Sequence, residues 1–215
     1  MKTRFYAILR GLTQKTHLGR RIALAAGGVL LMGFGMAVLE VLNFGTDPYT
    51  CLNNGLSMRT SLSLGTCGVL VSLLMFGFVF VFDASKIGIG TLCNMVGFGY
   101  AIELFRFILR QTPLADAVKI PFVRIALLVL MLAEFIFAVS LYLAADLGSA
   151  PYDAVPEILT KRLRKPFVLV RMIWDAAAVC IGFLLGSTVG VTTVVCALGV
   201  GPMAALVKRL FEDKL

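Results

Sequence analysis

An arginine and an aspartate stand four residues apart inside an apolar stretch in the second half of the chain. On a helix, Arg171 and Asp175 would share one face, where an ion pair lowers the cost of burying both charges. Charges inside apolar spans often mark function, so the pair is a candidate binding element. A bridge that only locks two helices together is the alternative.

Two glutamates within apolar stretches, Glu40 and Glu134, have no basic residue at helical spacing. Each therefore needs a partner from another helix, or a proton. We expect Arg171 to be the partner of Glu134. A carboxyl that gains and loses a proton in low-dielectric surroundings is suited to proton-coupled transport; for Glu134 the alternative is a satisfied polar contact.

A further set of polar residues follows two related turns. Residues 44–49 (FGTDPY) and 147–152 (LGSAPY) share the pattern apolar-Gly-(Thr/Ser)-x-Pro-Tyr, and the chain after each turn is half-polar and too short to span a bilayer. Proline suits the first turn of a helix, which Asp47 or Ser149 could cap. We predict a re-entrant or interfacial half-helix after each turn; an ordinary surface loop is the alternative.

A half-helix at membrane depth needs protein or a water-filled cavity around its exposed backbone groups, so it marks a cavity. Its N-terminus would attract anionic groups. For the tyrosines, a place in an interfacial aromatic belt is the alternative. The candidate substrate-binding residues are Pro48, Tyr49, Asn53, Asn54, Glu134, Pro151, Tyr152, Asp153, Arg171 and Asp175.

The elements that must position these residues are transmembrane helices. Of the 215 residues, 59% are apolar and 15% are charged, against about 45–50% and 25% in soluble domains. Six segments are long and apolar enough to cross a bilayer. They cover residues 22–42, 64–82, 87–109, 122–145, 167–185 and 188–210.

The two halves of the chain resemble each other. A shift of 103 residues superposes the two Pro-Tyr turns, and a shift of 102 superposes residues 87–91 (IGIGT) on 189–193 (VGVTT). Three crossings per unit predict an all-α membrane fold of six transmembrane helices in two inverted three-helix repeats, each with a half-helix. Folds of this kind recur in secondary transporters, with the substrate site near the midplane.

The predicted organisation has five parts. A basic cytoplasmic N-terminal tail covers residues 1–21, the first membrane repeat 22–109, a connecting loop 110–121, the second membrane repeat 122–210, and a cytoplasmic C-terminal tail 211–215. The glycines that open the third and sixth spans are expected to allow close helix packing.

The distribution of Lys and Arg predicts the orientation. With the N-terminus inside, fourteen of these residues fall on the cytoplasmic side and five outside, as the positive-inside rule requires when both termini are cytoplasmic. Inversion places the first Pro-Tyr loop outside and the second inside. Accordingly, Arg59 alone follows the first, whereas Lys161, Arg162, Arg164 and Lys165 follow the second.

Several function classes lack the residues that they need. His17 is the only histidine, and the five cysteines have no CxxC spacing, so we expect no metal, no cofactor and no enzymatic nucleophile–base set. The net charge of +8 flanks helices and points to anionic lipid headgroups rather than nucleic acid. No removed signal peptide is expected. The oligomeric state is left open, as is a small-molecule substrate.

The paired Gly-x-x-Pro-aromatic turns, the Gly-x-Gly-Thr helix start and residues 171–191 resemble the bacterial YczE/YyaS/YitT membrane proteins, over most of residues 28–207. The matching positions of the second half are Arg171, Asp175, Gly182, Leu185, Gly186, Gly190, Val191 and Thr193. Ser187 and Thr192 stand where glycine is usual, and Ala150 and Tyr152 where glycine and arginine often flank the proline. The resemblance implies a bacterial cytoplasmic-membrane protein.

These features favour a small secondary transporter or export permease, with its site between the half-helices, the Arg171–Asp175 pair and Glu134. The alternative is a non-transporting accessory or scaffold protein that uses the same helices only for packing. A transporter needs a polar route that reaches both Pro-Tyr turns alternately.

Overall fold

Five long helices form the body of the protein. The computed structural model describes residues 17–112 and 120–199, which hold helices and no strand. The long helices are α2 (Leu18–Val41), α4 (Leu64–Phe82), α5 (Ile89–Leu109), α7 (Pro121–Ala144) and α9 (Phe167–Leu184). Each is long and apolar enough to cross a membrane. They match the first five predicted spans to within a few residues.

The sixth predicted span is described only in part. Residues 188–199 belong to the described chain and are helical from 191 onward. The rest of that span lies outside the described residues, as do residues 1–16 of the N-terminal tail and the C-terminal tail at 211–215.

Two short helices follow the Pro-Tyr turns, as predicted. They are α3 (Pro48–Thr60) and α8 (Pro151–Leu163), and each begins with its proline at the first helical position. There the missing N–H leaves no bond unmade. Each ends at a residue in the left-handed conformation, Ser61 or Arg164. A one-turn helix, η1 (Ala84–Lys86), joins α4 to α5.

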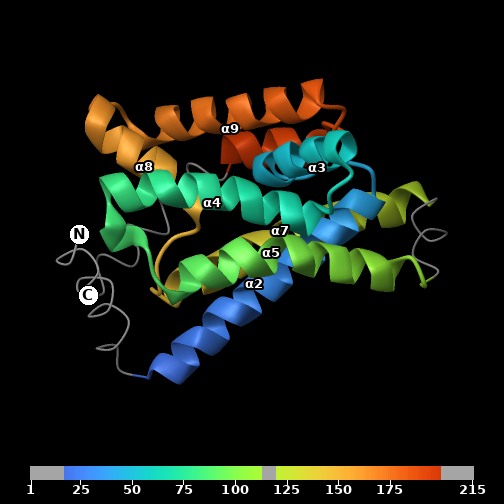
Figure 1. Ribbon diagram of the computed structural model, residues 1–215. Helices are drawn as coiled ribbons and strands as arrows, with labels where there is room; N and C mark the ends of the chain where they lie inside the picture. The colour runs from blue at the N-terminus through green and yellow to red at the C-terminus, as the bar shows by residue number, and fades with distance from the viewer. Residues whose placement is uncertain (1–16, 113–119, 200–215) are drawn as a thin grey trace.

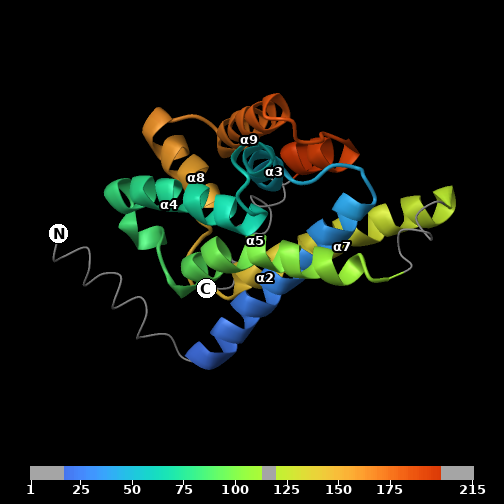
Figure 2. The ribbon, with the colours of Figure 1, turned by 45° about the vertical axis from the view of Figure 1, so that its right-hand side comes forward.

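The bundle is organised around α2. This helix packs along both α5 and α7, while α3 packs on α9 and α4 packs on α8. Figure 2 shows α2 running obliquely to α5 and crossing it. A Cβ added at Gly28 would lie 2.9 Å from the Tyr142 amide nitrogen, and one at Gly33 would lie 2.5 Å from the Ala101 Cβ. Small residues therefore bring α2 close to its neighbours.

Polar contacts gather at the two ends of this bundle. At the α8 end, Arg21 pairs with Asp146, Lys86 with Glu157, and Lys161 with Asp83. At the α3 end, Glu40 pairs with Arg106, Arg124 Nε donates to the Leu42 carbonyl, and Arg59 Nε donates to the Leu185 carbonyl. Thus α3 and α8 lie at opposite ends (Figure 1).

Backbone features recur at the spacing of the two turns. Positive φ angles occur at Asn43, Gly45 and Ser61, and again 103 residues later at Asp146, Gly148 and Arg164. Each turn also forms a backbone hydrogen bond with the other half of the chain. The Thr192 amide donates to the Phe44 carbonyl at 2.9 Å, and the Gly90 amide donates to the Leu147 carbonyl at 2.8 Å. Each turn is therefore bonded to a helix start in the other half of the chain.

Candidate functional site

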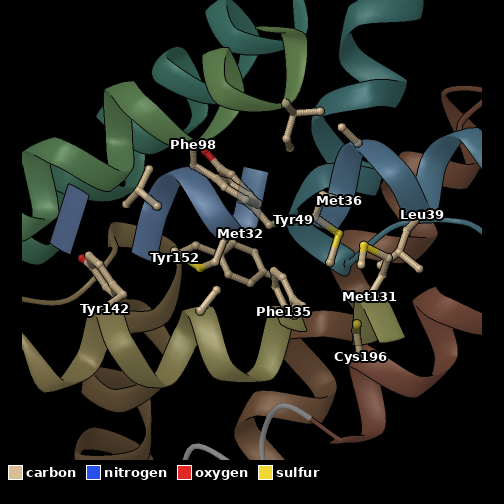
Figure 3. Packing of buried hydrophobic residues seen from close by; sticks show 14 of the residues in the cluster. Met32, Met36, Leu39, Tyr49, Phe98, Met131, Phe135, Tyr142, Tyr152 and Cys196 are labelled. Carbon is tan, nitrogen blue, oxygen red and sulfur yellow. The ribbon is translucent and has the colours of Figure 1, made fainter. Parts of the chain in front are cut away.

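The N-termini of α3 and α8 meet in the core. The Tyr49 and Tyr152 ring centroids are 5.1 Å apart, and both side chains are buried. Figure 3 shows the two tyrosines among Met32, Phe98 and Phe135, which come from three different long helices. The predicted half-helices therefore place their first turns, with Pro48 and Pro151, next to each other.

The two helix starts are capped differently. Asp47 is the N-cap of α3, and its Oδ2 accepts from the Tyr49 and Thr50 amides at 3.1 and 3.2 Å, as predicted. The expectation that Ser149 caps α8 is wrong, because the N-cap is Ala150 and no side chain caps the helix. Ser149 lies one residue too early, and its amide donates to the Lys86 carbonyl.

Each tyrosine hydroxyl bonds to the long helix that follows its own half-helix. Tyr49 donates to the Gly68 carbonyl at 2.8 Å and shares a hydrogen bond with Ser72 Oγ at 2.7 Å. Tyr152 donates to Asp175 Oδ1 at 2.7 Å. Ser72 and Asp175 each lie 23 residues after their tyrosine. Both halves therefore contain the same hydrogen bond between a tyrosine and the following long helix, but only the second half has a charged partner, Asp175.

Arg171 and Asp175 form the predicted ion pair within α9. Arg171 Nε donates to Asp175 Oδ2 at 2.8 Å, and Arg171 Nη1 donates to Asp153 Oδ1 of α8 at 2.5 Å. The Arg171 guanidinium lies 5.1 Å from the Tyr152 ring centroid, and the Trp174 ring packs on the same tyrosine. One cation thus faces two carboxylates, which leaves this cluster with excess negative charge.

The predicted contact between Arg171 and Glu134 is wrong. Both nitrogens that Arg171 uses go to aspartates, and both Glu134 carboxyl oxygens are buried without a hydrogen-bond partner among the described residues. Glu134 faces α2 instead, where the absent side chain of Gly35 leaves room for it. Asp175, four residues along α9, and Asp153 of α8 bind the Arg171 guanidinium in place of Glu134.

The two asparagines of α3 belong to different clusters. Asn53 Nδ2 donates to the Tyr49 carbonyl at 2.9 Å, which ties it to the central site. Asn54 Nδ2 donates to Glu40 Oε1 at 3.3 Å, and Arg106 of α5 pairs with the same glutamate. Glu40 therefore has the partner from another helix that it was expected to need.

Two carboxylates that make polar contacts with distant residues, Glu103 and Glu157, were not identified as candidates from the sequence. Glu103 Oε1 accepts from the Gly65 amide at 2.8 Å, at the start of α4. It is a carboxyl within an apolar span, so the signal that marked Glu40 and Glu134 was available for it. The pair of Lys86 with Glu157 joins residues 71 apart, and no local pattern predicts it.

Outside the spans, the pKa of Asp83 is lowered at the α8 end. The Ser85 hydroxyl donates to its Oδ1 at 2.5 Å, and Lys161 and Lys86 stabilise the carboxylate further. The described residues contain no group of three or more His, Cys, Asp or Glu that could hold a metal ion.

The candidate site thus contains most of the predicted residues. Hydrogen bonds and ring contacts connect Asn53, Tyr49, Tyr152, Asp175, Arg171 and Asp153 into one continuous set. Asn54 and Glu134 lie outside that set. The arrangement offers a buried aromatic pair, more carboxylates than cations and two opposed helix N-termini.

Comparison with known proteins gives relatives along nearly the whole chain. Residues 19–209 match the model of a family of unknown function, DUF6198. A Haemophilus influenzae protein described as uncharacterized is 29% identical over 84% of this chain and 78% of its own. A Bacillus subtilis protein described as the uncharacterized membrane protein YczE is 24% identical over 87% of this chain and 85% of its own. No solved structure matches.

Proposed function

This chain belongs to the family of unknown function DUF6198, and we propose that it is a small secondary transporter or export permease of the bacterial cytoplasmic membrane. The observation that carries the proposal is the contact between the first turns of α3 and α8, beside the buried Arg171–Asp175 pair and the partly exposed Asp153. Broken or half-length helices that end at a central polar site are typical of secondary transporters.

The fold proposed for this function has six transmembrane helices in two inverted repeats. The crossed hydrogen bonds from Thr192 to Phe44 and from Gly90 to Leu147 support it, as does the recurrence of positive φ angles at a spacing of 103 residues. In such a fold the two half-helices are re-entrant, and they enter from opposite sides of the membrane.

The proposed orientation puts the α8 end and both termini in the cytoplasm. Arg20, Arg21, Lys86 and the basic residues 161–165 belong to this end, whereas the α3 end has Arg59, Arg106, Arg110 and Arg124. The asymmetry agrees with the positive-inside rule.

Substrate would bind between the half-helices. There the side chains of Tyr49 and Tyr152 are buried and their rings contact each other. Glu134 is the proposed proton carrier, because both its oxygens are buried and no described side chain satisfies them. Proton uptake into proteoliposomes should therefore fall in Glu134→Gln, which keeps the size and polarity of the side chain.

Cysteine accessibility tests the proposal. In a chain whose five cysteines are replaced, Tyr49→Cys and Tyr152→Cys are each exposed to a membrane-impermeant maleimide from either side. A transporter should allow labelling of Tyr49→Cys from the α3 side and of Tyr152→Cys from the α8 side, since alternating access opens one end at a time.

Three control positions show how a buried cysteine and an exposed cysteine react in the same experiment. Met36→Cys, in the core of α2, should stay unlabelled throughout. Leu62→Cys, just beyond the end of α3, and Leu163→Cys, at the last residue of α8, are exposed and should react from their own sides. If Tyr49→Cys and Tyr152→Cys behave like Met36→Cys under every condition, the transport proposal fails and a scaffold role is favoured.

A further inference from the structure

The junction in front of α3 holds three buried oxygen atoms that have no hydrogen-bond partner within residues 17–112 and 120–199. Asp47 Oδ2 caps the helix, but Asp47 Oδ1 has no hydrogen-bond partner. Thr46 Oγ1 and Thr192 Oγ1 are also buried and unpartnered. All three residues are more than nine-tenths buried. Such groups are costly unless something else occupies the space beside them.

Backbone contacts hold these three residues at one junction. The Thr192 amide donates to the Phe44 carbonyl, two residues before Thr46. A Cβ added at Gly45 would lie 2.5 Å from both the Gly190 amide nitrogen and Thr193 Oγ1. The helix that starts at residue 191 therefore abuts the turn that leads into Asp47.

The other half of the molecule builds the same junction without two of these side chains, and Ser149 stands there in place of Thr46. There the Gly90 amide bonds to the Leu147 carbonyl at 2.8 Å. Alanine (Ala150) stands at the N-cap in place of Asp47, and Gly90 in place of Thr192. The resulting helix, α8, is 13 residues long, as is α3. The carboxylate and the Thr192 hydroxyl are thus not required to form the junction, so another role is left for them.

The chemistry of the donors indicates the ligand. One carboxylate oxygen and two hydroxyl oxygens form a set of hard ligands with a single negative charge, which suits an alkali cation. Ca²⁺ sites are usually built from several carboxylates, and Mg²⁺ is usually held by one or two carboxylates together with phosphates and waters. None of the ion pairs found within residues 17–112 and 120–199 involves Asp47, so no basic side chain there neutralises it by direct contact.

We propose that Asp47 Oδ1, Thr46 Oγ1 and Thr192 Oγ1 bind a sodium ion, with the Thr50 hydroxyl on the same turn of α3. The ion ties the start of α3 to the helix that starts at residue 191, and so joins the two halves of the chain. This site goes beyond the proposed transport function, since ion binding is measured on the purified protein whether or not a substrate crosses the membrane.

Binding of radioactive ²²Na⁺ to the detergent-purified chain tests the proposal directly. Trp174, the only tryptophan, gives a second readout, because its ring contacts Tyr152, which contacts Tyr49. Sodium chloride replaces choline chloride at constant ionic strength. We expect saturable binding of one ion per chain with a parallel fluorescence change, and at least about tenfold weaker binding in Asp47→Asn, which loses the charged contact.

Matched variants separate the ion site from general effects. Ser149→Ala alters the other junction and should bind Na⁺ as the wild type does. Thr192→Gly, which introduces the residue found at the other junction, should weaken binding and gives the answer if Asp47→Asn fails to fold. Absence of ²²Na⁺ binding to the wild type would overturn the proposal. So would an equal response to K⁺ or choline, a response to pH alone, or unchanged affinity in Thr192→Gly.

Discussion

At the scale of single residues, the two tyrosines Tyr49 and Tyr152 hold equivalent positions, but their hydroxyls bond to different kinds of group. Tyr49 bonds to a carbonyl and a hydroxyl, and Tyr152 bonds to the carboxylate of Asp175. Asp175 is fully buried, and it is stabilised only because Arg171 and Tyr152 both donate to it. The second half of the chain therefore carries the charged part of the candidate site.

Removing Asp175 alone should destabilise the protein more than removing the whole pair. Asp175→Ala leaves Arg171 with Asp153 only and leaves the Tyr152 hydroxyl without an acceptor, so we expect a loss of about 3 kcal/mol. In the double variant Arg171→Met/Asp175→Ala, much of that loss should be recovered, because the buried guanidinium is no longer left with the partly exposed Asp153 carboxylate as its one partner. Thermal unfolding in detergent measures both.

The control is Asp153→Ala, whose carboxylate is partly exposed and whose loss should cost less than that of Asp175. Equal destabilisation in Asp175→Ala and in the double variant would refute the pairing as the source of stability.

At the scale of elements, the turns that precede α3 and α8 depend on glycine. Gly148 has a φ of +98°, and a Cβ there would lie 2.6 Å from the Gly88 amide nitrogen and from Thr91 Oγ1. Both the backbone conformation and the close approach exclude a side chain. The same is true of Gly45 in the other turn, where φ is +82°.

Gly148→Ala should therefore destabilise the protein by more than about 2 kcal/mol. Gly77→Ala is the matched control, since a Cβ at Gly77 meets nothing within 4 Å; it should be neutral or slightly stabilising. Gly186→Ala, with a φ of +105° but its nearest contact at 3.8 Å, isolates the backbone strain and should fall between them. The order of the three melting temperatures checks the prediction, and similar values for Gly148→Ala and Gly77→Ala would contradict it.

The turns, short helices and long helices were predictable because each has a local signature. Pro48 and Pro151 start the half-helices, and apolar length marks the spans. The pair of Arg171 with Asp175 was predictable for the same reason, since i, i+4 spacing is local. The surroundings of Glu134 were not predictable, because they depend on how α7 rotates against α2 and α9. Asp153 as a second partner of Arg171 required knowing that α8 packs on α9.

At the scale of the whole molecule, the polar contacts divide the chain into two ends with different charge. Lys161, Lys86 and Arg21 belong to the α8 end, and all three form ion pairs there. The contacts sort the loops of the described residues into the same two groups as the Lys and Arg distribution does. This agreement matters because the contacts come from packing and the distribution comes from composition.

Serine replacements at the two ends test the orientation. Ser61→Cys and Ser85→Cys are both exposed and lie at the α3 and α8 ends. In intact cells that express the cysteine-free background, an impermeant maleimide should label Ser61→Cys at once. It should label Ser85→Cys only after the membrane is permeabilised. The reverse pattern would show that the α8 end faces outward, and equal labelling of both would show that the ends do not lie on opposite sides.

The crossed turns also impose an order on biogenesis. When Leu147 leaves the ribosome, its partner Gly90 has already been made, whereas the Phe44 carbonyl must wait for Thr192. The turn before α3 therefore lacks this hydrogen bond until the helix that starts at residue 191 has been made. A chain that stops before Gly190 keeps one crossed junction and lacks the other.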